Sequence, residues 1–226
     1  MFDLWTAAIG KVYSPNILLF LLEGLKNTLY IAAVTIALSL FAGTALAFLR
    51  FQKVKVLGAL AACYIEIVRN IPLTLFIIAM RFTTKLPPLA SGIAAMTVFT
   101  SAIAAEIIRG GLNNVQKGQW EAAYSQGFGV WGALRHVVVP QALEHIRSPL
   151  ISQFVTTIKD TSFCAVVGTY ELTFTSKIIA SHRSIVTMQD IMVVYLTVAL
   201  MYYGVNLFFS KWARRSRGNA AKGVVR

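Results

Sequence analysis

The chain has 226 residues, of which 57% are hydrophobic and only 13% charged, whereas soluble domains are usually about 25% charged. Together with several long uncharged runs, this composition excludes an ordinary soluble domain and indicates a membrane protein. A net charge of +12 could suggest a nucleic-acid partner, but the basic residues lie between and after the apolar runs. That distribution suits a membrane protein with positive cytoplasmic loops, and we expect no nucleic-acid partner.

Residues 1–17 are expected to form an external N-terminal segment and not a cleavable signal peptide. Asp3 lies where a signal peptide needs basic residues, and the first long apolar run begins only after Lys26. Trp5 could place this segment along the bilayer interface, where tryptophan is favoured. A disordered leader is the alternative.

Five apolar runs follow, and each is expected to cross the membrane as a helix. About 20 helical residues span a hydrocarbon core of about 30 Å. The runs cover residues 28–49, 56–80, 86–108, 150–167 and 191–209. We therefore expect an all-α transmembrane domain over residues 18–212, with a basic cytoplasmic tail at 213–226.

The distribution of Lys and Arg predicts the orientation of these spans. Five spans place the two termini on opposite sides of the membrane. The side with the C-terminal tail and the loops after the first and third spans has 13 basic residues, and the other side has 6. We expect an external N-terminus, a cytoplasmic C-terminus and a cytoplasmic loop over about residues 110–148.

Within this loop, residues 118–140 are predicted to form a helix, a turn and a second helix. Trp120, Ala123 and Tyr124 recur with helical spacing and would form one narrow contact face. Glu121 is expected in the first turn, where a carboxylate suits the positive end of the helix dipole.

The turn is expected at Gly127 and Gly129, because glycine tolerates the backbone conformations that end a helix and reverse the chain. Pro140 is expected to end the second helix. Small Ala122 and Ala123 would let the surface of a partner approach closely. From periodicity alone, an ordinary connector between two amphipathic helices is an equal alternative.

Charged residues lie within three of the apolar runs, and the second and third runs share one spacing. A charge at mid-bilayer costs on the order of 2.5–3.5 kcal/mol on insertion scales, so such residues normally face protein or water. Glu66 and Arg69 are three residues apart and can pair on one helix face, and Glu106 and Arg109 repeat that spacing. Structural ion pairs that fix helix packing are the alternative to a functional role for these charges. Pro72 is expected to loosen the second span.

Small residues follow one face of the first span. Ser39, Gly43 and Ala47 are four residues apart, which predicts close contact with another helix.

The loop and four further segments resemble the polar amino acid permeases of bacterial ABC importers. The cytoplasmic loop of these membrane subunits has the spacing EAA, three residues, G, nine residues, I-x-L-P. The residues here that match it are Glu121, Ala122, Ala123, Gly127 and Pro140. Val137 and Val139 stand where the pattern prefers Ile and Leu, which is a mild departure.

The four further segments occur in the same order as in that family, so the resemblance covers roughly residues 22–212. They are LEGLKNTLYIAAVTIALSLFAGTAL at 22–46, YIEIVRNIPL at 64–73, AAEIIRGG at 104–111 and IKDTSFCAVV at 158–167. Asn70 and Ile71 depart from it, because the family often has a small residue and Thr before the proline. This departure bears on substrate contacts and leaves the expected fold unchanged.

The resemblance implies a type I importer fold in the bacterial cytoplasmic membrane. It implies two ATP-binding subunits docked through the loop, a second permease that is a copy or a relative of this chain, and an extracytoplasmic amino-acid-binding protein. The sequence contains no phosphate-binding loop of the G-x-x-x-x-G-K-S/T kind. We therefore expect a non-catalytic chain that binds no cofactor, with ATP and Mg²⁺ on the partner ATPase.

The fourth run carries a polar stripe, which suggests the substrate pathway. Gln153, Thr157, Asp160 and Thr161 have the spacing of one helix face. A zwitterionic amino acid needs an acceptor for its ammonium group, which Asp160 could supply. Lys159 lies off this stripe and could meet the second permease or snorkel to the interface. Polar packing between helices is the alternative.

Glu66 and Arg69 complete the predicted pathway residues. The rival hypothesis from another class is a self-sufficient secondary carrier or small channel that uses Glu66, Arg69 and Asp160 as an ion relay. Against it stand the absence of an internal repeat and the otherwise unexplained cytoplasmic loop. A membrane anchor for a cytoplasmic complex would leave the buried charges without a role.

Overall fold

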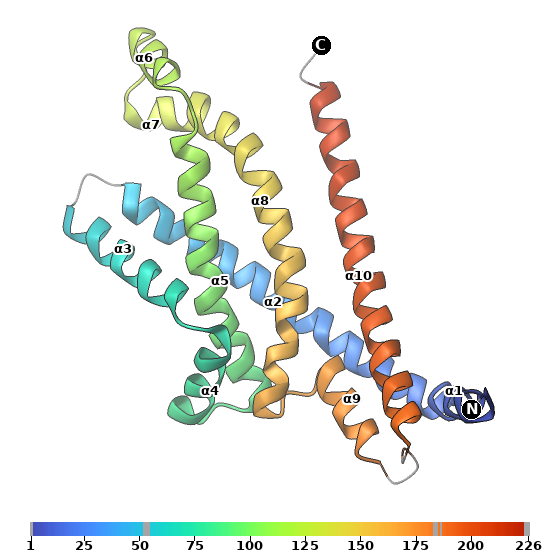
Figure 1. Cartoon of the computed structure of the whole chain (residues 1–226). Helices are drawn as coiled ribbons and strands as arrows, with labels where there is room; N and C mark the ends of the chain where they lie inside the picture. The colour runs from blue at the N-terminus through green and yellow to red at the C-terminus, as the bar shows by residue number, and fades with distance from the viewer. Residues whose placement is uncertain (1, 52–54, 183–184, 186, 224–226) are drawn as a thin grey trace. The chain divides into compact units, whose positions relative to one another are not determined.

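The computed structural model describes residues 2–51, 55–182, 185 and 187–223, and these residues form helices and short connections without a strand (Figure 1). Two compact units share the chain. Unit 1 comprises Met1–Val34, Leu73–Met96 and Val155–Arg226, and unit 2 comprises Thr35–Pro72 and Thr97–Phe154. Lys53, Arg183 and the last three residues, all part of predicted loops or the tail, lie outside the described residues.

The predicted all-α architecture is confirmed, although α2, α5 and α10 are longer than the apolar runs that they overlap. In chain order they are α1 (Phe2–Val12), α2 (Pro15–Phe51), α3 (Lys55–Asn70), α4 (Leu73–Thr84), α5 (Pro88–Asn113), α6 (Lys117–Ser125), α7 (Val130–Ala133), the π-helical turn η1 (Leu134–Val138), α8 (Val139–Asp160), the 3₁₀ helix η2 (Thr161–Val167), α9 (Leu172–Ala180) and α10 (Met188–Gly223).

Three helices among the described residues are long and apolar enough to cross a membrane, namely those at Pro15–Arg50, Pro88–Asn113 and Met188–Ala213. The pair α3 and α4 makes a fourth if it is one broken span. The remaining predicted span, residues 150–167, overlaps only the second half of α8 and η2, and it is not among these candidates in the described part of the chain. Length and composition therefore support at most four of the five predicted spans.

Two of the predicted spans are not continuous α-helices. The second is interrupted at Ile71 and Pro72, as expected from a proline that removes one backbone N–H and crowds the preceding turn. The fourth, predicted over residues 150–167, changes from α-helix to 3₁₀ helix after Asp160. The expectation of one straight helix was wrong there.

Small residues bring α2 and α5 into close contact within unit 2, as the spacing in the first span predicts. A Cβ added to Gly43 would lie 2.8 Å from both the Ala104 Cβ and the Ser101 carbonyl oxygen. Ser39 and Ala47, one turn to either side, are buried. Such contacts let helix backbones approach where apolar burial gives little net gain, as in a membrane.

A second glycine contact joins α5 to α8 in the same unit. A Cβ on Gly111 would overlap the side chain of Ile146 and lie 3.3 Å from the Ala142 carbonyl oxygen. Gly110, its neighbour on the helix, has no such contact within 4 Å. Because α5 leads into the loop and α8 leads out of it, this contact fixes the base of the loop.

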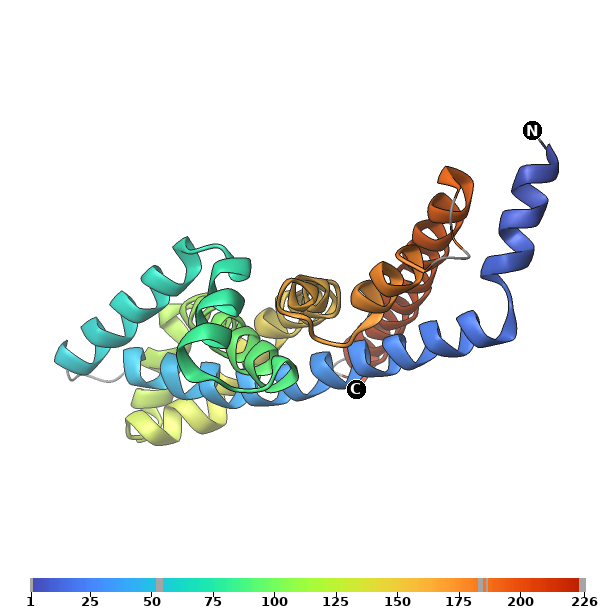
Figure 2. The same ribbon diagram turned by 90° about the horizontal axis from the view of Figure 1, so that it is seen from below.

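Unit 1 has its own apolar core, which includes the N-terminal segment. α1 is a helix that packs against α10, and Figures 1 and 2 both show α9 beside α10. Buried residues of this core include Val12, Leu172 and Val194. The Lys11 Nζ lies 3.1 Å from Oδ2 of the buried Asp190, which ties α1 to the start of α10. The first segment is therefore an ordered helix and not the disordered leader that was the alternative.

The two adjacent glycines of α5 allow a matched test of the α5–α8 contact. Gly111→Ala should destabilise the folded chain by about 1–3 kcal/mol, because overpacking forces Ile146 or the backbone to move. Gly110→Ala should be neutral or slightly stabilising, because the site is open and alanine favours a helix. The measurement is the fraction of detergent-solubilised protein that stays monodisperse after heating. Equal heat resistance of the two variants would contradict this packing.

Candidate functional site

The loop between α5 and α8 reverses the chain at a left-handed glycine. Gly127 has φ +86°, a conformation that residues with a Cβ rarely adopt. The Phe128 N–H donates to the Ala123 carbonyl at 3.1 Å, and the Gly127 N–H donates to the Tyr124 carbonyl at 2.9 Å. These two hydrogen bonds form a Schellman motif at the end of α6. The predicted turn at Gly127 is therefore present, and its backbone requires glycine.

The second half of the loop corrects the prediction for Pro140. The backbone stays helical from Val130 through α7, η1 and α8, and Pro140 is the second residue of α8. Pro140 therefore does not end the helix. The π-helical turn just before it has wider hydrogen-bonded rings than an α-helix, and these leave room for the proline ring.

The EAA residues differ in what they present to solvent. α6 begins at Lys117, so Glu121 is its fifth residue and lies beyond the first turn, contrary to expectation. Glu121 and Ala122 are exposed, whereas Ala123 is only 2% exposed. Ala123 therefore packs inside the loop, and only the first two residues of the triplet are available to a partner.

Large apolar side chains are exposed around the turn. The Trp131 side chain is 69% exposed, and Tyr124, Phe128 and Val130 are also exposed. A Cβ at Gly129 would meet nothing within 4 Å. We call these side chains, together with Glu121 and Ala122, the loop surface. Exposed apolar residues clustered on a water-facing loop are typical of a protein interface.

The loop surface rests on internal contacts that make it stiff. The Phe128 and His136 rings stack with centroids 5.8 Å apart. The Gln141 Nε2 donates to the Gln119 Oε1 at 3.0 Å and so joins α6 to α8. Movement of α5 or α8 would therefore carry the loop surface with it.

Glu106 on α5 is the centre of an arginine cluster in unit 2. Its carboxylate accepts from Arg109 Nη2 at 2.7 Å and from Arg50 Nη1 at the end of α2. Arg69 Nη1 at the end of α3 lies 3.9 Å from the Glu106 Oε2. The predicted Glu106–Arg109 pair is confirmed. The expected Glu66–Arg69 pair is wrong, because Arg69 faces Glu106 and the exposed Glu66 forms no ion pair among the described residues.

The other predicted pathway residues lie on α8 and its continuation. Gln153 is half-buried and belongs to unit 2, whereas the residues from Thr157 onward belong to unit 1. Thr157 and Thr161 are buried, and the Thr161 hydroxyl donates to the Ile158 carbonyl at 2.8 Å. Because η2 begins at Thr161, the predicted stripe does not continue as one α-helical face.

Asp160 ends α8 with a half-buried carboxylate, and the neighbouring Lys159 is exposed. In the part of the chain that the structure describes, no side chain forms a hydrogen bond or an ion pair with this carboxylate. A partly desolvated carboxylate without a donor is costly in protein. Asp160 is therefore suited to a cation or donor that comes from outside the chain.

A buried carboxylate that the sequence did not single out caps α9. Glu171 is fully buried and accepts hydrogen bonds from the Thr173 N–H at 2.9 Å, the Phe174 N–H at 2.7 Å and the Tyr202 hydroxyl at 2.9 Å. Burial raises the pKa of this carboxyl, and the hydrogen bonds oppose that shift. The sequence signal for this cap was an acidic residue immediately before the start of α9. The contact with Tyr202 on α10 had no such signal.

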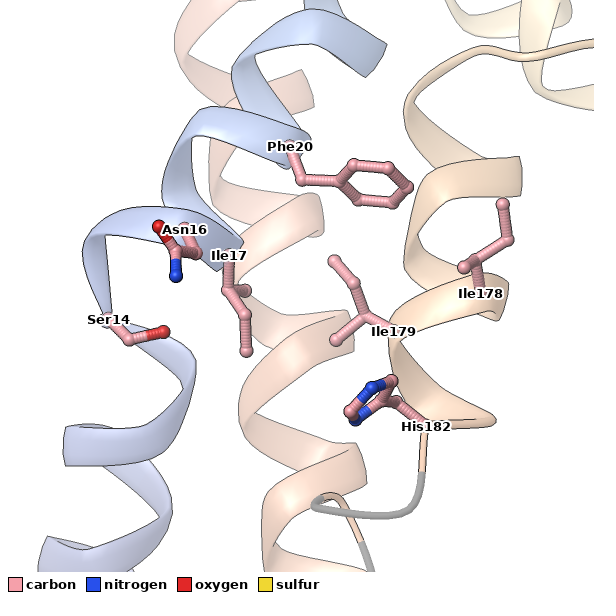
Figure 3. Close-up of a pocket in the computed structure, with 7 residues that line it drawn as sticks. All are labelled: Ser14, Asn16, Ile17, Phe20, Ile178, Ile179 and His182. Atoms are coloured by element: carbon pink, nitrogen blue, oxygen red, sulfur yellow. The ribbon is translucent and has the colours of Figure 1, made fainter.

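A half-open cavity of about 500 Å³ lies between the start of α2 and α9 in unit 1 (Figure 3). Figure 3 shows the Phe20 and Ile179 side chains directed into the space between the two helices. The lining is mainly apolar, and it comprises Ser14, Asn16, Ile17, Phe20, Ile178, Ile179 and His182. None of the predicted site residues lines it. The described residues contain no group of His, Cys, Asp or Glu side chains that could hold a metal ion.

The structure has helices long and apolar enough to span a membrane, a cluster of partly buried charges and a loop with exposed apolar side chains, as a membrane transport subunit would. Comparison with known proteins identifies its family. Residues 36–216 match the family model described as "Binding-protein-dependent transport system inner membrane component". The chain belongs to this family.

Two curated relatives cover most of the chain. The probable glutamine ABC transporter permease protein GlnP of Bacillus subtilis (strain 168) is 40% identical over 208 residues, which is 90% of this chain and 94% of the relative. The glutamine transport system permease protein GlnP of Escherichia coli (strain K12) is 30% identical over 190 residues, which is 80% of this chain and 87% of the relative. These relatives are named permeases, which confirms the prediction of a non-catalytic subunit.

Solved structures share the fold. One described as "Crystal structure of an amino acid ABC transporter with histidines" matches with a TM-score of 0.83 and 27% identity, over 90% of this chain and 95% of that chain. An inward-facing structure of the MetNI methionine ABC transporter matches with a TM-score of 0.72 at 18% identity, over 89% and 98%, and supports the fold alone. The chain is therefore a multi-pass inner-membrane permease of the ABC importer type, and the rival carrier or channel hypothesis is not favoured.

Proposed function

We propose that this chain forms half of the translocation pathway of an ATP-driven importer of polar amino acids. The relatives named above concern glutamine, and a further relative, the L-cystine transport system permease protein TcyL of Bacillus subtilis, is 30% identical over 89% of this chain. Glutamine and cystine are both polar amino acids with an ammonium and a carboxylate group. Alternating access would come from two permease halves rocking about the bound solute.

The loop surface carries this proposal, because a permease without its own ATPase needs a mechanical connection to one. Glu121 and Ala122 are exposed beside a turn whose backbone conformation requires glycine at position 127. The α5–α8 contact at Gly111 joins the loop to two membrane helices. In our proposal a cleft of the ATPase receives the loop surface, with the buried Ala123 supporting it from within and the exposed Pro140 at the start of the helix that follows it.

The assembly would contain this permease, a second permease that is a copy or a relative, two ATP-binding subunits and an external amino-acid-binding protein. ATP and Mg²⁺ would be bound by the ATP-binding subunits, and this chain would bind no cofactor. The bilayer surrounds the permease pair.

Asp160 is proposed to hold the ammonium group of the amino acid. Its half-buried carboxylate at the end of α8 has no hydrogen bond or ion pair among the described residues, unlike the buried Asp190, which pairs with Lys11. Gln153, Thr157, Lys159 and Thr161 would line the pathway near it on the same stretch of chain. Glu66 and Arg69 are the next candidates, although the contact of Arg69 with Glu106 gives it a structural role as well.

Uptake of glutamine by the reconstituted complex tests this function. Vesicles that contain the wild-type complex should accumulate glutamine when ATP is supplied on the side of the ATP-binding subunits. They should not accumulate it when only an ion gradient is supplied. Asp160→Asn should raise the apparent KM about ten- to hundredfold per assembled complex, because a charge-assisted hydrogen bond to the ammonium group is lost.

The matched control is Asp190→Asn, which removes a carboxylate that already has an ion-pair partner in Lys11. It should lower the yield of complex and leave the KM per complex unchanged. An unchanged KM for Asp160→Asn would remove Asp160 from the site without touching the importer class. Uptake that runs on an ion gradient without ATP would contradict the class itself.

We further propose an external N-terminus and a cytoplasmic C-terminus, supported by the 13 basic residues on one side against 6 on the other. In a Cys63→Ser, Cys164→Ala background, an impermeant thiol reagent should label exposed Ser181→Cys from outside intact cells and miss exposed Lys211→Cys. Opening the cells should expose the second site to the reagent. The reverse pattern would overturn the orientation.

A further inference from the structure

The arginine cluster around Glu106 has more positive charge than its single carboxylate can neutralise. Arg50, Arg69 and Arg109 each carry one positive charge, so the four side chains have a net charge of +2. The Glu106 side chain is 17% exposed, and those of Arg50, Arg109 and Arg69 are 24%, 36% and 49% exposed. The carboxylate thus lies innermost and the guanidinium groups lie around it.

The hydrogen bonds of the carboxylate are unequally shared. Arg109 Nε lies 3.2 Å and Nη2 2.7 Å from the Glu106 Oε2, so this pair has the forked geometry of a strong ion pair. Arg50 Nη1 donates to Oε1. At 3.9 Å, Arg69 Nη1 is too far from Oε2 for a hydrogen bond.

Most of the donors in the cluster therefore form no hydrogen bond with Glu106. A guanidinium group carries five N–H donors, and Arg69 uses none of them on Glu106. Glu66, one turn before Arg69, forms no ion pair within the described part of the chain. The cluster consequently offers several donors that Glu106 does not bind, together with two uncompensated positive charges.

A purely structural role accounts for only part of this arrangement. One arginine with a forked contact would satisfy Glu106, and each further guanidinium group adds repulsion. Arg50 and Arg69 each lie in the last turn of a helix, where the dipole favours a cation by roughly 0.3–1 kcal/mol. That contribution offsets part of the repulsion between the guanidinium groups. It supplies no protein acceptor for the N–H groups that do not bind Glu106.

We propose that this cluster binds a phosphate-type oxyanion, either the headgroup of an anionic lipid or free phosphate. The planar forks of arginine match the oxygen atoms of a phosphate group. A second anion would lower the net charge to about +1 for a lipid phosphodiester and to about zero for doubly charged free phosphate. An anionic headgroup would then tie α2, α3 and α5 to the surrounding bilayer. This binding is distinct from the pathway proposed around Asp160 and does not depend on it.

The test uses the assembled complex in nanodiscs of phosphatidylcholine alone or of phosphatidylcholine mixed with phosphatidylglycerol. Phosphatidylglycerol retained per permease is measured by mass spectrometry after detergent extraction. Arg69→Gln should retain it about tenfold less well than wild type, because charge-assisted hydrogen bonds are lost. Arg69→Lys should fall between the two, because it keeps the charge and loses the fork.

Arg81→Gln is the matched control, because Arg81 lies on α4 and forms no ion pair among the described residues; it should retain the lipid as wild type does. In phosphatidylcholine discs, inorganic phosphate is added and the melting temperature is recorded. A saturable rise for wild type that is absent in Arg69→Gln, without lipid retention, would assign the site to a free oxyanion.

The result that overturns the proposal is equal behaviour of wild type, Arg69→Gln and Arg81→Gln in both arms. Should Arg69→Gln fail to assemble, Arg69→Lys and Arg50→Gln decide in the same way. If both of these match wild type in lipid retention and in the phosphate response, the cluster binds no oxyanion.

Discussion

The carboxylate of Glu106 is the interaction on which the rest of unit 2 depends. It lies on α5 and binds arginines that end α2 and α3, so one acidic side chain ties three helices together. Removing it would leave three guanidinium groups close together without an anion, which is far more costly than losing a surface pair. The small residues at Gly43 and Gly111 then let α2 and α8 approach the same helix closely.

This anchoring of α5 supports the proposal that the loop transmits motion. Gly111 lies five residues after Glu106, and α6 begins six residues later. The loop is stiff because of the Schellman motif at Gly127 and the contact between Gln119 and Gln141. A stiff loop on anchored helices can pass a displacement from a partner into the membrane, whereas a flexible connector would absorb it.

Local features of the fold were predictable from sequence, and features set by distant residues were not. The helix ending at Gly127, the break at Pro72 and the pair Glu106–Arg109 follow from residues close together in the chain. The contact of Arg50 with Glu106 joins residues far apart, and no spacing rule indicates it. The same carboxylate explains the error for Arg69. Its position three residues after Glu66 predicted a pair with Glu66, but it pairs with Glu106.

Two other errors came from departures from the regular α-helix. A π-helical turn lets Pro140 continue the helix it was expected to end, and the 3₁₀ helix after Asp160 interrupts the predicted polar stripe. Both segments are too short to produce a hydrophobic period in the sequence that differs visibly from that of an α-helix. The buried Glu171 was missed although its two backbone partners lie two and three residues after it, because its burial and its contact with Tyr202 arise only in the folded chain.

Site-specific photo-crosslinking is the most direct test of coupling through the loop. A photoreactive amino acid replaces exposed Trp131 on the loop surface or, as a control, exposed Leu200 on α10, in the assembled complex. Crosslinks to the ATPase should form from position 131 and not from position 200, and Gly127→Val should abolish them because valine resists the left-handed turn. Crosslinks to the ATPase from position 200 alone, or an undiminished yield from position 131 in Gly127→Val, would contradict coupling through this loop.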